Sequence, residues 1–357
     1  MVFDFGSHPV RQFLIDNALF FVEEYCVDGF RYDEVSVIDH ESYGHGWGFC
    51  QDLTNTLRHF HPHVLQHAEY WPVNPVVIRE TTEGGAGFHT TMTDGPRIAL
   101  RRVLDAASFP GDHPLPLDAP GDQLGIGYLR DRWRGVNSIE NHDLVLLPKG
   151  ADDHNRMPRI PTVADRSDPC SWFARSRARV ATGILLTAPG IPMVFMGQEF
   201  SEEEQWSDHL PGDAHLLIDW AGLDDPADPR RRYFAAFFAA LAGLRSAFSG
   251  LRGEVFRIVH VHEQNRVLAF HRWIEDQGHD ILVVAHLGNA HRFDYRIGFP
   301  GGGGWREVFN SDFYESLPNP NLMGNGGSVF ASNQPLHDFV FSAPLTLPAN
   351  SLLVFSR

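Results

Sequence analysis

The chain has 357 residues, of which 43% are hydrophobic and 21% are charged, a composition typical of a globular protein with room for two domains. Its formal net charge of −16 argues against a nucleic-acid partner, because phosphate contact depends on Lys and Arg. It contains no apolar run of about 18 residues and no signal-peptide pattern at its start, so we expect a cytoplasmic protein with no membrane partner.

Strand and helix patterns alternate over the first two thirds of the chain. Ser7 and Pro9 predict the start of a helix running to Tyr25. Its apolar residues recur at helical spacing and are expected to form one buried face: Val10, Phe13, Leu14, Ala18, Phe21, Val22 and Tyr25. The further strands are predicted at 27–32, 63–69, 88–92, 135–139 and 190–196. The further helices are predicted at 51–60, 94–104, 171–187 and 229–244, with a loop over 144–169.

This alternation implies parallel strands joined by helices, as in a barrel, where chemistry sits at the carboxyl ends of the strands. The continuous apolar run 190–196 predicts a strand buried on both faces, with Met193 and Met196 in the core. From about Ser249 the pattern changes to short strand-like runs separated by glycine-rich turns, such as 301–304 and 324–327. We therefore predict a catalytic domain over residues 1–248 and an antiparallel all-β domain over 249–357.

The segment Asp28–Val35 is the strongest local signal in the chain. Arg31 and Asp33 are two residues apart, so in a strand they point to the same side, at its carboxyl end. A guanidinium held beside a carboxylate keeps that carboxylate ionised and oriented. Chemistry at the anomeric carbon of a sugar needs such a group.

Glu69 and Asp143 are two other acidic residues that stand out at or just after the ends of predicted strands. Retaining glycoside chemistry uses two carboxyl groups roughly 5–5.5 Å apart, one as nucleophile and one as acid. A third can stabilise the transition state electrostatically. Carboxylates are plentiful in this chain, so each of the three can instead be a solvated loop residue. Spacing alone does not decide between these interpretations.

Four segments together are more specific. Residues 28–33 resemble the nucleophile strand of the alpha-amylase family of glycoside hydrolases and transglycosylases. Residues 67–69 resemble its general-acid strand, 141–143 its transition-state carboxylate motif, and 188–200 its last barrel strand. Outside these motifs, the segments 2–5, 9–11, 17–21, 70–75 and 84–88 resemble the glycogen-branching-enzyme subgroup.

The resemblance implies a role for each matched residue. Asp33 would be the nucleophile, Glu69 the general acid and base, and Asp143 the transition-state stabiliser, acting by double displacement. Arg31 would hold Asp33 ionised, and Asn141 and His142 would bind sugar hydroxyls.

Several aromatic and cysteine residues admit more than one interpretation. Tyr70 and Trp71 are expected to stack on sugar rings, or else to pack in the core, and the same alternatives hold for Trp47 and Trp206.

No cofactor or metal is expected, and no ligand cluster indicates the structural calcium that some relatives hold. The three cysteines, at 26, 50 and 170, have no metal-like spacing and are expected to be buried reduced thiols.

The chain departs from the family pattern at its start. The nucleophile strand is normally the fourth of eight, yet only about 25 residues precede Val27, and the family's Asp–Asn-His motif of the third strand has no match. The implied fold class is the C-terminal part of a (β/α)8 barrel, with its first strands missing, followed by an all-β sandwich. Either the chain is a fragment of a longer protein or it is a half-barrel that needs a partner. In both cases we expect poor solubility and little activity of the chain alone.

Three functions remain open at this point. The first is a 1,4-alpha-glucan branching enzyme acting on glycogen or amylose. The second is a hydrolytic alpha-amylase-like glycosidase, because transfer and hydrolysis use the same carboxylates. The third is an inactive fragment or glucan-binding module.

Overall fold

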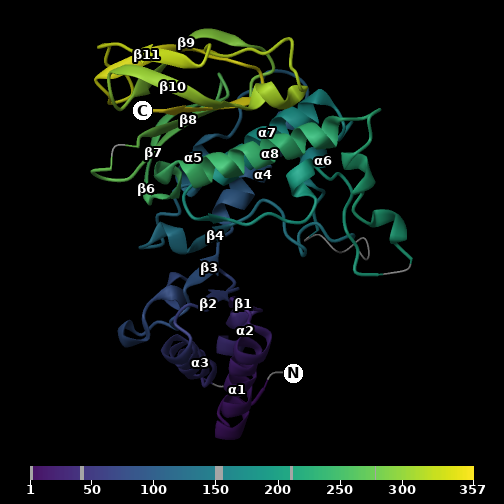
Figure 1. Cartoon of the computed structure of the whole chain (residues 1–357), viewed down its shortest axis with the longest axis vertical. Coiled ribbons are helices and arrows are strands. Elements are labelled where there is room, and N and C mark those ends of the chain that lie inside the picture. Colours follow the sequence, from purple (N-terminus) through teal and green to yellow (C-terminus); the bar gives the residue numbers. More distant parts are fainter. Residues whose placement is uncertain (1–2, 41–43, 149–155, 210–211, 278) are drawn as a thin grey trace. The chain divides into compact units, whose positions relative to one another are not determined.

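The computed structural model describes residues 3–40, 44–148, 156–209, 212–277 and 279–357 (Figure 1). Val2 of the segment 2–5, and residues 149–155 of the predicted loop, lie outside the described residues. The chain forms two compact units, one of residues 1–94 with 127–136 and one of residues 95–126 with 137–357. Among the described helices, none is long and apolar enough to cross a bilayer.

The first unit combines a short parallel sheet with helices and 3-10 turns. Its strands are β1 (Gly29–Tyr32), β2 (Leu65–Ala68), β3 (Thr90–Met92) and the first two residues of β4 (Gly135–Asn137), paired in that order. Its helices are α1 (His8–Tyr25), α2 (Val35–His40) and α3 (Gly46–Phe60), and its 3-10 turns are η1 (Pro75–Ile78), η2 (Thr81–Glu83) and η3 (Arg132–Arg134). Gly29 allows β1 and β2 to pair closely, because a Cβ there would lie 2.7 Å from the carbonyl oxygen of Leu65.

Helix α1 confirms the predicted helix but only part of its predicted buried face. Its buried residues are Ile15, Ala18 and Val22, whereas Phe13 and Tyr25 are each 65% exposed. Ser7 precedes the helix without a side-chain capping bond. The periodicity was correct, but an apolar stripe is buried only where another element covers it.

The second unit contains the remaining helices. They are α4 (Gly95–Ser108), α5 (Asp118–Gln123), α6 (Ile160–Ala164), α7 (Trp172–Thr187), α8 (Arg230–Ala247) and α9 (Ser249–Arg252), with 3-10 turns η4 (Gln198–Phe200), η5 (Ala214–Leu216) and η6 (Ala221–Leu223). The helices predicted at 171–187 and 229–244 are thus confirmed. The predicted loop over 144–169 was wrong in part, because it contains α6.

The predicted buried strand at 190–196 was also wrong in extent. Strand β5 is limited to Ile191–Pro192, and the amide of Met193 donates to the carbonyl of Asn137 at the end of β4. Ile191 is 38% exposed and Met196 is 45% exposed, so this apolar run is not enclosed on both faces and Met196 is not a core residue.

The C-terminal part of this unit is antiparallel. A six-stranded sheet has the order β11-β10-β13-β8-β7-β6, and β9 pairs with β12. The strands are β6 (Val255–His262), β7 (Val267–Trp273), β8 (Ile281–His286), β9 (Arg292–Phe299), β10 (Gly303–Asn310), β11 (Ser328–Ala331), β12 (Phe341–Leu347) and β13 (Ser351–Ser356), with a 3-10 turn η7 (Ser311–Glu315) after β10.

The central strands β7, β8 and β13 carry apolar residues on both sides because both faces of the sheet are buried. In β13, Leu353 and Phe355 join a core shared with β9 and β12, while Leu352 and Val354 join a core shared with the helices. Figure 1 shows α7 and α8 against this second face. Gly183 of α7 allows the close approach, since a Cβ there would lie 2.9 Å from Leu352 Cδ1.

These features confirm the predicted fold class: parallel strands with helices, consistent with part of a (β/α)8 barrel, followed by an antiparallel all-β sandwich. The domain boundary between residues 248 and 249 stays a prediction. The cysteines differ from expectation, because Cys50 is buried but Cys26 is exposed at the C-cap of α1.

Candidate active site

The first unit brings Arg31, Asp33 and Glu69 together at the carboxyl ends of β1 and β2. The two strands are parallel and pair Tyr32 with Ala68, so the residues that follow them lie side by side. The amide of Glu69 donates to the carbonyl of Tyr32 at 3.0 Å, which extends the pairing by one residue. Pairing in this register therefore carries both carboxylates to one edge of the sheet.

Arg31 binds both carboxylates with separate nitrogens. Its Nη1 lies 2.7 Å from Asp33 Oδ1, and its Nη2 lies 2.7 Å from Glu69 Oε2. The carboxylate of Asp33 is 76% exposed, whereas that of Glu69 is only 5% exposed. One carboxyl group thus faces solvent while the other is enclosed, and a single guanidinium orients both.

The turn after β1 encloses Glu69. The amide of Glu34 donates to Glu69 Oε2 at 3.2 Å, and the amide of Val35, which begins α2, donates to the Glu69 carbonyl at 2.8 Å. Trp71 donates its indole N–H to Glu69 Oε1 at 3.1 Å. Glu34 has a φ of 45°, which turns the chain back over the carboxylate. Each carboxylate oxygen of Glu69 therefore has a fixed donor.

His67 lies beneath this edge on β2, opposite Arg31 in the strand register. Its ring Nδ1 is 2.9 Å from Thr90 Oγ1, and burial, with the nearby Arg31 charge second, lowers its pKa to about 4. The imidazole is therefore neutral at neutral pH, and it adds no second positive charge beside Arg31.

The two aromatic residues after Glu69 occupy different surroundings. Tyr70 is 3% exposed, and its hydroxyl donates to Asp39 Oδ2 at 2.7 Å and lies 3.0 Å from His40 Nε2. These contacts favour a packing role for Tyr70. Trp71 is half-buried and contacts Glu69 directly. A sugar-stacking role stays a prediction for both.

The motif Asn141-His142-Asp143 belongs to the second unit. Asn141 is buried, and its Oδ1 accepts from the amide of Leu144 at 2.8 Å, which forms a tight turn. His142 Nε2 lies 3.2 Å from Asp143 Oδ2, and both side chains are about half exposed, at 47% and 58%. Arg156 contacts the Asp143 carbonyl and, at 3.8 Å, its carboxylate. The turn thus presents His142 and Asp143 to solvent.

A buried ion pair between Glu140 and Arg159 stabilises the segment directly before this turn. Glu140 Oε2 accepts from Arg159 Nη1 at 2.8 Å, and each side chain is 1% exposed. Arg159 also donates to the carbonyls of Met196 at 3.1 Å and Glu204 at 2.9 Å. The pair therefore ties the segment before Asn141 to the segment after β5.

Trp206 contacts the motif more closely than its sequence pattern suggested. Its indole N–H donates to the His142 carbonyl at 2.6 Å, and its backbone bridges to Leu146. The sequence left Trp206 open between sugar stacking and core packing, and it did not indicate this contact or a role for Glu140 or Arg159. Glu140 directly precedes the motif, which is a usable signal, but Arg159 has none because only folding brings it there. In the described residues, no cluster of three or more His, Cys, Asp or Glu could hold a metal ion.

The chain is similar to known proteins over its whole length. The profile of the alpha amylase C-terminal all-beta domain matches residues 258–357. The 1,4-alpha-glucan branching enzyme GlgB of Myxococcus xanthus is 29% identical over 376 residues, covering 100% of this chain and 48% of that protein. The GlgB of Rhodococcus jostii is 28% identical and covers 99% of this chain and 48% of that protein. The chain therefore resembles the alpha-amylase family over its whole length, and its residues 258–357 match the C-terminal domain of that family.

Solved structures show the alpha-amylase fold as well. An alpha-amylase from Geobacillus thermoleovorans, crystallised with acarbose, superposes with a TM-score of 0.66 at 17% identity, covering 98% of this chain and 64% of that one. A pullulanase from Bacillus acidopullulyticus gives 0.62 at 16% identity, covering 98% and 40%. The chain spans about half the length of the curated alpha-amylase-family relatives that it matches.

Proposed function

We propose that this chain carries catalytic residues of a 1,4-alpha-glucan branching enzyme, which transfers 1,4-linked glucan segments to a 6-hydroxyl of glycogen-type polysaccharide. The observation that supports it best is the Arg31 guanidinium, bound at once to Asp33 and Glu69 at the ends of adjacent parallel strands. The branching-enzyme names of relatives that match the whole chain support the same choice.

In the proposed reaction Asp33 is the nucleophile, because its carboxylate is oriented by Arg31 and exposed. A carboxylate oxygen of Asp33 bonds to the anomeric carbon while the glycosidic C–O bond breaks. Glu69 gives its proton to the departing oxygen. The product is a glycosyl ester on Asp33 and a free 4-hydroxyl on the shortened donor.

In the second step Glu69 removes a proton from the 6-hydroxyl of an acceptor glucan. That oxygen attacks the anomeric carbon, the ester to Asp33 breaks, and the configuration is retained. Asp143 is proposed to stabilise the oxocarbenium-like state, with Asn141 and His142 binding sugar hydroxyls.

The experiment compares two polypeptides with amylose: this chain alone and the product of the complete reading frame that contains it. Branching is measured as 1,6-linkages released by a debranching enzyme, and hydrolysis as new reducing ends. The proposal expects at least one of the two polypeptides to form 1,6-linkages without a matching rise in reducing ends. Asp33→Asn and Glu69→Gln should each abolish them, while Asp28→Asn, an exposed residue directly before β1, should not.

Three outcomes separate the alternatives. A rise in reducing ends without 1,6-linkages supports the hydrolytic glycosidase. Glycogen binding that survives both substitutions, with no turnover in either polypeptide, supports a glucan-binding module. Branching that persists in Asp33→Asn contradicts the proposed nucleophile.

A cytoplasmic location also belongs to the proposal, and cell fractionation tests it.

A further inference from the structure

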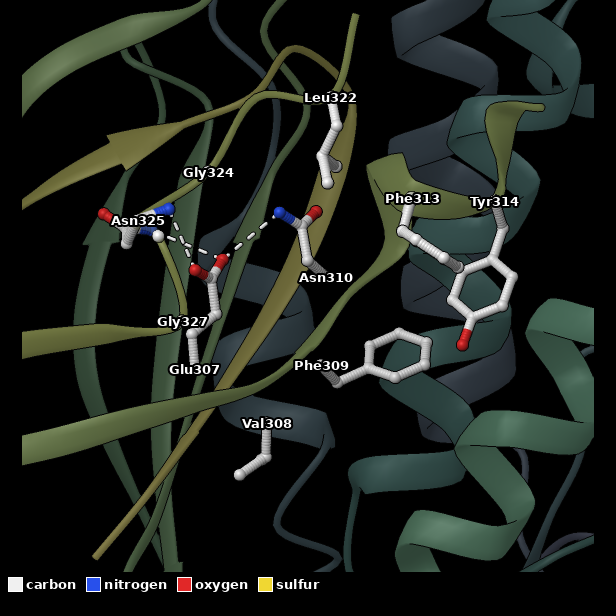
Figure 2. Close-up of a pocket in the computed structure, with 11 residues that line it drawn as sticks. Glu307, Val308, Phe309, Asn310, Phe313, Tyr314, Leu322, Gly324, Asn325 and Gly327 are labelled. Atoms are coloured by element: carbon white, nitrogen blue, oxygen red, sulfur yellow. Dashed lines mark hydrogen bonds between the residues drawn. The ribbon is translucent and has the colours of Figure 1, made fainter. Parts of the chain in front are cut away.

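A pocket in the C-terminal all-β part has no role in the proposed chemistry. It is about 470 Å³ in volume, within the ~300–1,000 Å³ range of small-molecule sites. Strand β10 forms its floor from Glu307 to Asn310, η7 contributes Phe313 and Tyr314, and the loop 322–327 closes it. Figure 2 shows aromatic rings gathered on one side and polar side chains on the other.

The aromatic side is a supported platform. Phe309 is 6% exposed and stacks on Tyr314, with centroids 5.6 Å apart and planes at 22°. Phe313 meets Tyr314 edge to face at 5.1 Å and is 43% exposed. Tyr314, itself stacked on Phe309, thus supports Phe313, whose ring remains partly exposed.

The polar side centres on the carboxylate of Glu307. It accepts from Asn310 Nδ2 at 3.2 Å, from the Asn325 amide at 2.8 Å and from Asn325 Nδ2 at 3.4 Å. Within the described chain, Glu307 forms no ion pair with a cationic side chain. A carboxylate has about four acceptor sites, so it can accept a further hydrogen bond from a ligand hydroxyl.

The glycine-rich turn 324–327 builds this side. A Cβ at Gly324 would lie 2.5 Å from Asn310 Nδ2, and Gly326 and Gly327 have φ values of +64° and +86°. Asn325 is clamped to β12, because its Oδ1 accepts from the Thr346 amide at 2.8 Å. Glu307 and Asn325 are therefore positioned before any ligand binds, which limits the entropy lost on binding.

We propose that this pocket binds a short segment of α-1,4-linked glucan, as a site separate from the catalytic carboxylates. A pyranose ring has an apolar C–H face, which suits Phe313, and hydroxyls at its edge, which suit Glu307. The three N–H donors on Glu307 already balance part of its charge, which favours a neutral ligand over a cation. The identity of the sugar polymer rests on the proposed function.

The test is calorimetric titration of the whole chain with maltoheptaose, in the Asp33→Asn, Glu69→Gln background so that turnover cannot interfere. Phe313→Ala should weaken binding at this site about tenfold. Phe330→Ala, which removes a ring that is 70% exposed on β11 outside the pocket, should leave binding unchanged. Phe313→Trp should retain it.

The possible outcomes of the titration distinguish the pocket proposal from the proposed function. If Phe313→Ala binds maltoheptaose as tightly as its parent, or if the parent does not bind, the pocket proposal is overturned. Binding of tetralysine, but not maltoheptaose, that is lost in Phe313→Ala also overturns it. Binding that depends on Phe313 in a protein without branching activity supports the pocket and contradicts only the proposed function.

Discussion

Arg31 Nη2 lies 2.7 Å from Glu69 Oε2, across the β1–β2 pair, while Nη1 of the same guanidinium binds Asp33. The Arg31 guanidinium therefore binds both carboxylates at once and holds them next to each other. Its position follows from the parallel register that sets Arg31 opposite His67, two residues before Glu69.

Replacing Arg31 with Met should impair both function and stability. We expect kcat for branching to fall about 10²-fold, because both carboxylates lose a preorganised partner. The free energy of unfolding should fall by about 1–3 kcal/mol, because the nearly buried Glu69 loses a charged hydrogen bond. Urea unfolding measures the second effect. The control Arg257→Met removes an exposed ion pair and should cost less than about 1 kcal/mol.

The buried Glu140–Arg159 pair should matter more for stability than an exposed pair. Glu140→Gln leaves the Arg159 charge buried and uncompensated, so we expect a loss of about 3–5 kcal/mol in urea unfolding. The double variant Glu140→Leu, Arg159→Met should lose less stability than the sum of the losses from Glu140→Leu alone and Arg159→Met alone. Asp105→Asn, in the exposed pair with Arg166, is the control. If the stability losses of the two single variants simply add up in the double variant, Glu140 and Arg159 are not energetically coupled and the prediction is wrong.

His67 should make stability depend on pH between about 4 and 6.5. Burial lowers its pKa to about 4 in the folded chain, so only the unfolded state binds a proton across this range. Stability due to His67 is therefore complete above pH 6.5 and falls as the pH drops towards 4. Going from pH 7 to pH 5 should cost about 2 kcal/mol through this residue. His67→Gln should reduce the loss by that amount, whereas His59→Gln, at the exposed end of α3, should not.

The outer face of α1 should limit the solubility of the chain. Phe20, Phe21 and Tyr25 are exposed and contact one another, with ring centroids 5.4–5.7 Å apart. Contiguous apolar surface of this kind promotes association. Light scattering should detect aggregation of the chain alone, and Phe20→Gln with Tyr25→Gln should reduce it. Phe293→Gln, on β9, removes a ring that is 63% exposed and should have little effect. A chain that stays monomeric at high concentration would contradict this expectation.

Some features were predictable because they depend on residues close in sequence. The Arg31–Asp33 pair follows from the two-residue period of a strand, and the structure places it as expected. The helix at α7 follows from the Ser171 cap, whose Oγ accepts from the Ala174 amide at 2.9 Å. The short strand-like runs after Ser249 also depend on neighbouring residues, and β7, β8 and β13 confirm them.

Other features depend on which element covers which. The stripe on α1 has helical spacing, but no periodicity reveals that Phe13 and Tyr25 are exposed. Arg159 reaches Glu140 from 19 residues away, and the approach of α7 to β13 at Gly183 involves segments much further apart. Burial is a property of the packed structure, so the sequence pattern alone cannot assign it.

The sequence by itself determined most of the helices and strands, the fold class and the resemblance to the alpha-amylase family, because local periodicity and short motifs depend on neighbouring residues. Tertiary structure alone decided that Arg31 also binds Glu69, that Glu140 and Arg159 support the Asp143 turn, and that a pocket forms beside Phe313. These contacts depend on strand register and packing between distant segments, where a shift of one residue would remove them.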